Sequence, residues 1–199
     1  MFYHRCCNAL NEVYTLPLIT INLEDAMILY VMRHAEAVVG NDTLQDEWRY
    51  LTENGRLAAK KVSSSIARYG PKPRLIITSP LTRAVQTAEI AAEKAWRKNV
   101  VVASGLLLPG AGISELVTHL KGCKDAKRVM LVGHEPQLGL LVATLIGRDD
   151  EAISLKKGAC LTLKLDPDSD DKPAGFLWYL VPGKKRVTSF KRAFPQKKP

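Results

Sequence analysis

Four side chains in the sequence have the chemistry to bind and attack a phosphoryl group: Arg33, His34, Arg83 and His134. Guanidinium groups present planar forks of donors that fit phosphate oxygens, and a neutral imidazole can act as a nucleophile. Each of these residues follows a short apolar run, and Arg83 also falls in the first turn of an expected helix, where the helix N-terminus favours an anion. Because arginines repel a cation, the pattern favours a phosphate site over a metal site, and we expect no metal and no cofactor.

Short apolar runs alternate with amphipathic stretches, which is typical of an α/β domain with a largely parallel sheet. The runs are nearly continuous and aliphatic, as expected for strands that are covered on both faces. They predict strands at 27–32, 75–78, 100–103 and 128–132, and two later strands at 159–165 and 175–181. Ligand sites of open α/β sheets lie at the carboxyl ends of the strands. We therefore expect three strand ends to bring the two arginines and the two histidines to one rim.

Helices are expected between these strands. Thr52 is a good N-cap for a helix that runs to about Tyr69, and Ser79 with Pro80 starts a second helix that reaches about Arg97. Two further helices are predicted at 114–121 and 137–146. The alternation of strand and helix along the chain supports the α/β assignment.

Positive charge is concentrated at the C-terminus. The formal net charge is +9, from 29 Lys and Arg against 20 Asp and Glu. From Gly183 onward the chain carries seven basic residues and no acidic one, so the rest of the chain is nearly neutral. A charge run at a terminus is usually a solvated tail, although it can also steer acidic partners such as phosphoproteins or nucleic acid. No recognised nucleic-acid-binding motif occurs, so a nucleic-acid binder that uses this tail comes last among the functions considered.

The composition predicts one globular domain with additions at both ends. Hydrophobic residues make up 46% of the 199 residues and charged residues 25%, and no apolar run reaches the roughly 18 residues of a membrane span. We expect an N-terminal extension at 1–26, a catalytic domain at 27–182 and a basic C-terminal tail at 183–199. Residues 1–26 do not form a signal peptide, and the four cysteines show neither a C-x-x-C pair nor a metal-binding spacing. Both features favour a cytoplasmic protein.

Four segments resemble, in order and spacing, the motifs of the histidine phosphatase superfamily. They are VMRHAEA at 31–37, LTENGR at 51–56, IITSPLTRAVQTAE at 76–89 and LVGHEPQ at 131–137. Within the superfamily the chain is similar to the SixA-type phosphohistidine phosphatases over about residues 27–181. Only 50 residues separate Arg83 from His134, which leaves no room for the large capping insertion of the mutase-type members. One departure is Ala35, where much of the superfamily has Gly, and we expect it to shift the His34 backbone only slightly.

The resemblance implies a phosphoglycerate mutase-like fold, which is a three-layer α/β/α sandwich with a mostly parallel central sheet. It implies that His34 is the nucleophile and that Arg33, Arg83 and His134 complete the catalytic and phosphate-binding set. Glu36 is a further candidate for substrate binding, although it could equally orient Arg33. We expect the positive field to lower the pKa of His34 so that it is neutral, and we expect a protonated His134 that acts as an additional donor.

The expected activity is the removal of phosphate from phosphohistidine on a protein, through a covalent phosphohistidine enzyme. No carboxylate matches the general-acid motif of the mutase-type members, which fits a phosphohistidine substrate because imidazole leaves more easily than an alkoxide. Glu36 and Glu115 are the fallback general acids. The alternatives are a small-molecule phosphomonoesterase with the same four residues and a catalytically silent phosphate-binding module. The choice of substrate is expected to depend on the loops at 38–50 and 107–114.

Overall fold

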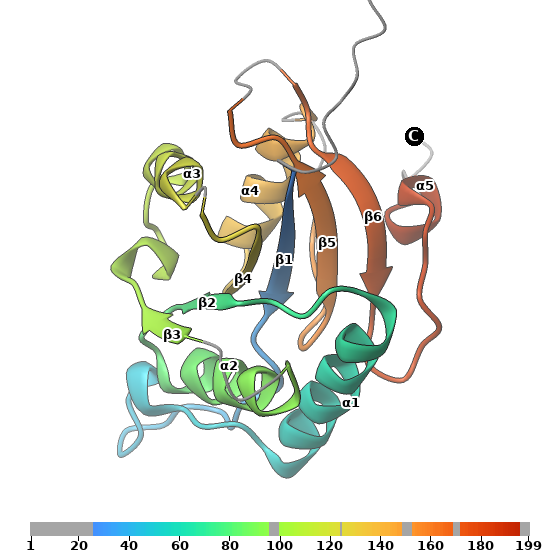
Figure 1. Ribbon diagram of the computed structural model, residues 1–199. Helices are drawn as coiled ribbons and strands as arrows, with labels where there is room; N and C mark the ends of the chain where they lie inside the picture. The colour runs from blue at the N-terminus through green and yellow to red at the C-terminus, as the bar shows by residue number, and fades with distance from the viewer. Residues whose placement is uncertain (1–25, 96–99, 124, 149–152, 169–171, 196–199) are drawn as a thin grey trace, which may run out of the picture.

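A central six-stranded sheet with helices on both faces forms the computed structural model, which describes residues 26–95, 100–123, 125–148, 153–168 and 172–195 (Figure 1). The strands are β1 (Met27–Arg33), β2 (Leu75–Thr78), β3 (Val100–Ala103), β4 (Arg128–Gly133), β5 (Cys160–Leu165) and β6 (Gly175–Leu180). Their order in the sheet is β3-β2-β4-β1-β5-β6. Strands β1 to β4 are parallel, whereas β5 runs antiparallel to β1 and β6 antiparallel to β5. The sheet is therefore mostly parallel, as the sequence predicts, with an antiparallel pair at one side.

The helices form the two outer layers of the sandwich. They are α1 (Glu53–Tyr69), α2 (Thr82–Ala95), α3 (Ile113–Gly122), α4 (Gln137–Leu145) and the short α5 (Phe190–Ala193), with 3-10 turns η1 (Asp46–Trp48) and η2 (Gly105–Leu107). Helices α1 and α2 pack on one face of the sheet and α3 and α4 on the other. The predicted α/β/α sandwich is thus confirmed. None of the helices in the described ranges is long and apolar enough to cross a membrane.

Strand β1 lies between two hydrophobic cores. Leu29 and Val31 contribute to the core beneath α3 and α4, and Tyr30 and Met32 contribute to the core beneath α1 and α2; all four are fully buried. Successive side chains of a strand point to opposite faces, so a strand that is covered on both faces needs a continuous apolar sequence. This explains why the run that precedes Arg33 and His34 shows no polar alternation.

Strand β3 differs from this expectation. It is the edge strand next to β2, and all four of its residues are exposed. The prediction that 100–103 is covered on both faces is therefore wrong. Its valines favour an extended backbone because they are β-branched, and not because they are buried.

The helix boundaries follow local hydrogen bonding. Thr52 is the N-cap of α1, because its Oγ1 accepts a hydrogen bond from the amide of Gly55 at 2.9 Å. Helix α2 begins at Thr82 rather than at Pro80, because the amide of Ser79 still donates to Val132 of β4. Ser79 therefore extends the strand end instead of capping the helix, and the predicted helix end near Arg97 lies outside the described residues.

The first turn of α1 lies against the backbone next to His34. A Cβ atom added at Gly55 would lie 2.0 Å from the carbonyl oxygen of Glu36, much closer than van der Waals contact. The amide of Thr52 also donates to this carbonyl, at 3.0 Å. Glycine at position 55 is therefore required for the close approach that holds the segment after β1.

We expect Gly55→Ala to lower the free energy of unfolding by about 1–3 kcal/mol, as other overpacking substitutions do. Urea denaturation monitored by circular dichroism measures the change. Gly122→Ala in the last turn of α3 is the matched control, because an added Cβ there meets no atom within 4 Å. Equal stability of the two variants would contradict the close approach at Gly55.

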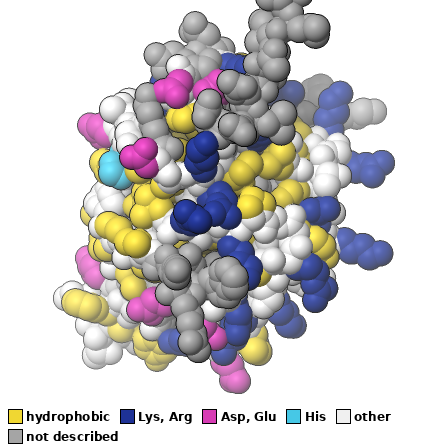
Figure 2. All heavy atoms as spheres, in the orientation of Figure 1, with side chains coloured by type: hydrophobic (Ala, Val, Ile, Leu, Met, Phe, Trp, Pro, Cys, Tyr) yellow, Lys and Arg dark blue, Asp and Glu magenta, His cyan; other side chains and the backbone are white. Residues whose placement is uncertain are grey.

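The basic C-terminal segment packs on the sheet as far as residue 195. Val187 pairs with Tyr179 of β6, and the rings of Phe190 and Phe194 lie 5.5 Å from Phe176 and 4.9 Å from Tyr179, respectively. The expectation of a wholly solvated tail is thus wrong for this part, because apolar residues alternate with the basic ones. Lys and Arg side chains gather on the right of Figure 2, the side on which Figure 1 places α5 and α1. The N-terminal extension, apart from Ala26, and residues 196–199 lie outside the described ranges.

Candidate active site

The four predicted residues meet at the carboxyl ends of the parallel strands. Arg33 ends β1 and pairs in register with Gly133, the last residue of β4, so His34 and His134 follow side by side. Their ring centroids are 4.9 Å apart. Arg83 in the first turn of α2 acts electrostatically on both histidines, and so does Arg33. The expected rim is therefore present.

The hydrogen bonds of His34 fix its tautomer. Nδ1 lies 2.7 Å from the carbonyl oxygen of Ala35, which can only accept a hydrogen bond. Nδ1 must therefore carry the proton, and in the neutral ring Nε2 keeps a free lone pair. The His34 side chain is 8% exposed, and its pKa is lowered to about 4, first by burial and then by Arg83 and Arg33. The neutral form agrees with the expectation, although burial contributes more than the arginines.

His134 is also neutral, which corrects the expectation of a protonated ring. Its pKa is lowered to about 3, first by burial and then by the neighbouring His34 and Arg83. Nε2 lies 2.8 Å from Ser79 Oγ, whereas Nδ1 is buried without a hydrogen-bond partner in the part of the chain that the structure describes. When Ser79 donates its hydroxyl proton to Nε2, Nδ1 carries the ring proton and is a free donor.

Arg83 is held by an acidic residue that the sequence analysis did not single out. Nη1 donates to the backbone carbonyl of Asp46 at 2.6 Å, and Nη2 donates to Asp46 Oδ2 at 2.9 Å. Arg49 donates to Asp46 Oδ1 at 2.8 Å. Hydrogen bonds from Arg49 and Arg83 keep the pKa of Asp46 below its usual range, so Asp46 is ionised. A guanidinium has five N–H donors, so Arg83 retains donors for an anion.

Arg33 is held through the backbone of a neighbouring segment. Its Nη1 donates to the carbonyl of Leu155 at 2.8 Å, and the amide of Leu155 donates to Glu135 Oε1 at 3.1 Å. Glu135 therefore holds the backbone of Leu155, and the carbonyl of Leu155 in turn holds Arg33. The Nε of Arg33 is buried and makes no hydrogen bond within the described ranges. An unpartnered buried donor carries a desolvation cost, which an incoming oxyanion would remove.

Helix α2 is tied to the backbone after His34. Thr87 Oγ1 accepts a hydrogen bond from the amide of Ala35 at 3.1 Å and donates to the carbonyl of Arg83 at 2.7 Å. The methyl group of Ala35, at the position where much of the superfamily has Gly, is fully buried. It lies 3.5 Å from the site of an added Cβ on Gly158, which is ordinary van der Waals contact. Ala35 is thus accommodated next to a glycine.

Of the two glutamates considered as general acids, Glu36 has another partner. Glu36 is exposed, and its carboxylate accepts a hydrogen bond from Thr52 Oγ1 at 3.1 Å. Within the described ranges it makes no ion pair with Arg33. Glu115 lies in the first turn of α3, where its Oε2 is 2.5 Å from the position of an added Cβ on Gly112. The orienting role considered for Glu36 toward Arg33 therefore has no direct contact to support it.

Four residues near this site were given no role at it by sequence reasoning. Ser79, Thr87 and Glu135 all lie inside the motif segments, where Ser79 was interpreted only as a helix cap. Asp46 lies in the loop 38–50, and only the expectation that this loop determines substrate choice pointed to it. Its contact with Arg83 spans 37 positions of the sequence, which no local pattern encodes.

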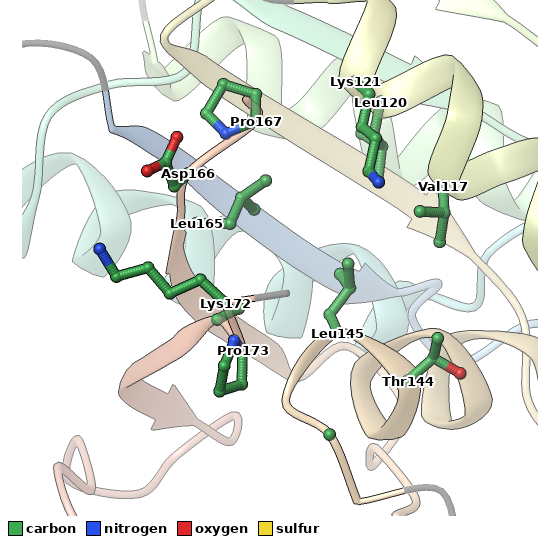
Figure 3. Close-up of a pocket in the computed structure, with 12 residues that line it drawn as sticks. Val117, Leu120, Lys121, Thr144, Leu145, Leu165, Asp166, Pro167, Lys172 and Pro173 are labelled. Carbon is green, nitrogen blue, oxygen red and sulfur yellow. The ribbon is translucent and has the colours of Figure 1, made fainter. Parts of the chain in front are cut away.

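A cavity of about 280 Å³ lies away from these residues (Figure 3). Its lining includes Leu165, which pairs with Met27 at the start of β1, so the cavity is at the opposite end of that strand from His34. The lining is mostly apolar and contains neither Arg nor His. The described residues also include no group of three or more His, Cys, Asp or Glu that could hold a metal ion.

Comparison with known proteins identifies the family. Residues 29–106, which include Arg33, His34 and Arg83, match the model of the histidine phosphatase superfamily (branch 1). An uncharacterised protein of Picosynechococcus sp. is 35% identical over 142 residues, which are 69% of this chain and 85% of that protein. The chain belongs to the histidine phosphatase superfamily. Membership in this superfamily supports a phosphatase activity.

Solved structures agree on the fold of this superfamily member. A protein from Agrobacterium tumefaciens assigned as the phosphohistidine phosphatase SixA is 22% identical, with a TM-score of 0.67 over 78% of this chain and 98% of that one. The protein histidine phosphatase SixA complexed with tungstate is 22% identical, with a TM-score of 0.68 over 78% and 97%. A mycobacterial glucosyl-3-phosphoglycerate phosphatase is 18% identical, with a TM-score of 0.59 over 76% and 97%. At these identities the likeness shows a shared fold.

Proposed function

We propose that this histidine phosphatase removes phosphate from phosphohistidine on another protein, with His34 as the nucleophile. The observation that carries the proposal is the tautomer of His34, whose Nε2 keeps a free lone pair in a ring 4.9 Å from that of His134, where Nδ1 has no hydrogen-bond partner among the described residues. The lack of a capping insertion in the described chain between Arg83 and His134 supports a protein substrate. Between Arg83 and His134 the described chain forms only the rest of α2, β3, η2, α3 and β4, all of them parts of the sandwich, so a phosphorylated side chain can approach from solvent.

In the first step, His34 Nε2 attacks phosphorus in line. A bond forms between Nε2 and phosphorus as the bond between phosphorus and the substrate imidazole breaks, and the leaving imidazole takes a proton from solvent. Charge on the equatorial oxygens is stabilised by Arg83, by the free Nε of Arg33 and by Nδ1 of His134. Such preorganised donors are the chief catalytic device for a loose phosphoryl-transfer transition state.

In the second step, water attacks phosphorus from the side that the product has left. The new bond to oxygen forms as the bond to His34 Nε2 breaks, so inorganic phosphate leaves with the water oxygen. One water proton stays on the phosphate and the other returns to solvent, which balances the proton that the leaving imidazole took up, and Nδ1 donates to Ala35 throughout. No metal or cofactor takes part in either step.

The surroundings of the nearby carboxylates favour a P–N bond over a phosphate ester. Asp46 is held ionised and donates no proton at neutral pH, and Glu36 is engaged with Thr52. Burial raises the pKa of Glu135, but its carboxylate is engaged with the amide of Leu155. Cleavage of an ester expels an alkoxide and benefits from a general acid, whereas imidazole is a much better leaving group. This difference is why we place phosphohistidine above small phosphate esters.

A competition assay tests the proposal. Purified protein receives a phosphotransfer domain phosphorylated on histidine together with a simple aryl phosphate, with and without a chelator. We expect a higher kcat/KM for the domain, unaffected by the chelator. A higher kcat/KM for the aryl phosphate would assign the protein to small-molecule phosphomonoesterases, and loss of activity with chelator would contradict the mechanism.

The nucleophile should stay neutral in acid. Because folding lowers the pKa of His34 to about 4, the ring protonates only as the pH falls through about 4, whereas an ordinary histidine protonates near 6.5. NMR titration of the ligand-free protein measures this directly, with circular dichroism to verify folding at each pH. A His34 signal that titrates near pH 6.5 would contradict the buried tautomer.

Removal of the Asp46 carboxylate should lower kcat for every substrate. Asp46→Ala leaves Arg83 with only the backbone carbonyl as a partner, and loss of one charged hydrogen bond corresponds to about a 10-fold effect. Asp46→Asn should lose less, because its amide oxygen can still accept from Nη2. Steady-state kinetics with aryl phosphate measure both variants, and equal losses for Ala and Asn would show that the hydrogen bond itself does not matter.

A further inference from the structure

Three exposed apolar side chains lie on the loop between Ala37 and Leu51. Val39 is 84% exposed, Trp48 65% and Tyr50 49%. Large apolar groups that a chain leaves in water together, and not scattered singly, mark interaction surfaces. Tryptophan and tyrosine are also the side chains most often found at the energetic centre of protein interfaces.

The loop is a folded unit, so the backbone that carries these side chains has a defined position. Ala37 and Leu51 form an antiparallel bridge, and the amide of Val38 donates to the carbonyl of Tyr50 at 2.9 Å. Arg49 Nε donates back to the carbonyl of Val38 at 2.7 Å. The segment that carries Val39 therefore runs next to the segment that carries Trp48 and Tyr50.

Contacts to α2 hold this loop at the rim of the candidate active site. Asp46 of η1 receives both hydrogen bonds from Arg83, and the amide of Leu51 donates to Gln86 Oε1 at 2.8 Å. In Figure 1 the loop, in light blue, follows the carboxyl end of β1 and lies beside α2. The segment that carries the exposed side chains therefore lies next to Arg83 of the candidate active site.

Because His34 is buried, a protein substrate has to contact the surface around it. The His34 side chain is 8% exposed, so a phosphohistidine on a protein reaches it only if the protein surface around that residue rests on the rim. A small substrate needs no such contact. On the β5 side, the exposed Lys156 and Lys157 precede Gly158, whose amide donates to the His34 carbonyl. The rim thus offers apolar groups from one segment and positive charge from another.

We infer that the loop 37–51 is the docking surface for the phosphohistidine-bearing protein, with Trp48 as its main anchor. The inference rests on the proposed function. The partner surface that fits has an apolar patch on one side of its phosphohistidine, to cover Trp48, Val39 and Tyr50, and acidic side chains on another side, to face Lys156 and Lys157. Trp48 and Val39 make this a specificity surface, whereas Asp46 in the same loop positions Arg83 for any substrate.

The test compares two substrates that carry the same P–N bond. One is a phosphotransfer domain phosphorylated on histidine, and the other is free phosphohistidine. We expect Trp48→Ala to raise KM for the domain about 10-fold, as loss of an interface anchor does, and to leave kcat/KM for free phosphohistidine unchanged. Val39→Ala should act in the same direction with a smaller effect. The matched control is Val100→Ala, because Val100 is 57% exposed at the start of β3, away from the rim.

Binding without turnover gives a second readout. On a His34→Ala background, Trp48→Ala should weaken the affinity for the phosphorylated domain, measured by calorimetry, by the same factor. An equal loss on both substrates, or no loss on either, overturns the inference. So does wild-type protein that hydrolyses the domain no faster than free phosphohistidine, or a change in molar mass by light scattering that shows a second copy of the chain on the loop. If only aryl phosphate is hydrolysed, the proposed function itself fails.

Discussion

His34→Ala is expected to show no turnover of phosphohistidine or of aryl phosphate. The substitution removes Nε2, which forms the bond to phosphorus in the proposed mechanism, and no other histidine among the described residues is placed to replace it. His134 is nearest, but its Nε2 is engaged with Ser79. Single-turnover assays with radiolabelled substrate measure the loss, and wild-type protein in the same assay should carry one acid-labile, base-stable phosphate that mass spectrometry locates on His34.

A matched control separates chemistry from folding. His119→Ala replaces an exposed histidine of α3 and should retain full activity. His34→Ala should keep the thermal stability of a folded protein, because β1 is held by two cores on either side. Activity that survives in His34→Ala would contradict the mechanism, and a labelled phosphoenzyme in that variant would assign the nucleophile to another residue.

Arg83→Ala should lower kcat by about 10²–10³, the effect of removing one preorganised donor from an oxyanion site. The expected loss has two parts, because in the proposed mechanism the guanidinium contacts the phosphoryl oxygens, and it also donates to Asp46 at the rim. Arg83→Lys should recover little, because a compact ammonium lacks the planar fork with which the guanidinium bonds both Asp46 oxygens and still presents donors to the substrate. Steady-state kinetics with aryl phosphate measure both variants without involving the docking surface.

Arg56→Ala is the control for charge. Arg56 is an exposed arginine of α1 and lies in the motif segment 51–56, yet it makes no contact with Arg83 among the described residues. Its removal changes the net charge by the same amount and should leave kcat with aryl phosphate near the wild-type value. If both arginine variants lost activity equally, the overall field rather than the position of Arg83 would be responsible.

Much of the fold and of the rim was predictable because it depends on local patterns. The apolar run before Arg33 marks a strand buried on both faces, and the N-cap at Thr52 follows from its side chain alone. The boundaries of the six strands agree with the structure to within one residue. Since the strands are parallel, their carboxyl ends necessarily bring Arg33, His34 and His134 to one edge of the sheet.

The parts that could not be predicted depend on distant contacts and on burial. The protonation of His134 was expected wrongly, because its depth beneath the rim depends on the whole fold rather than on neighbouring residues. The pairing of Asp46 with Arg83 needs the loop 38–50 to fold onto α2. Likewise, the exposure of β3 follows from its place at the sheet edge, which a run of valines does not reveal.

The placement of β1 between two cores has a consequence for local unfolding. The strand that ends in Arg33 and His34 has neighbours on both edges and packed helices on both faces, so it opens only when the whole domain unfolds. Asp46, by contrast, is 57% exposed in its loop and can separate from Arg83 at much lower cost. As conditions become destabilising, we expect the contact between Asp46 and Arg83 to be lost first, whereas His34 keeps its position until the sheet itself separates.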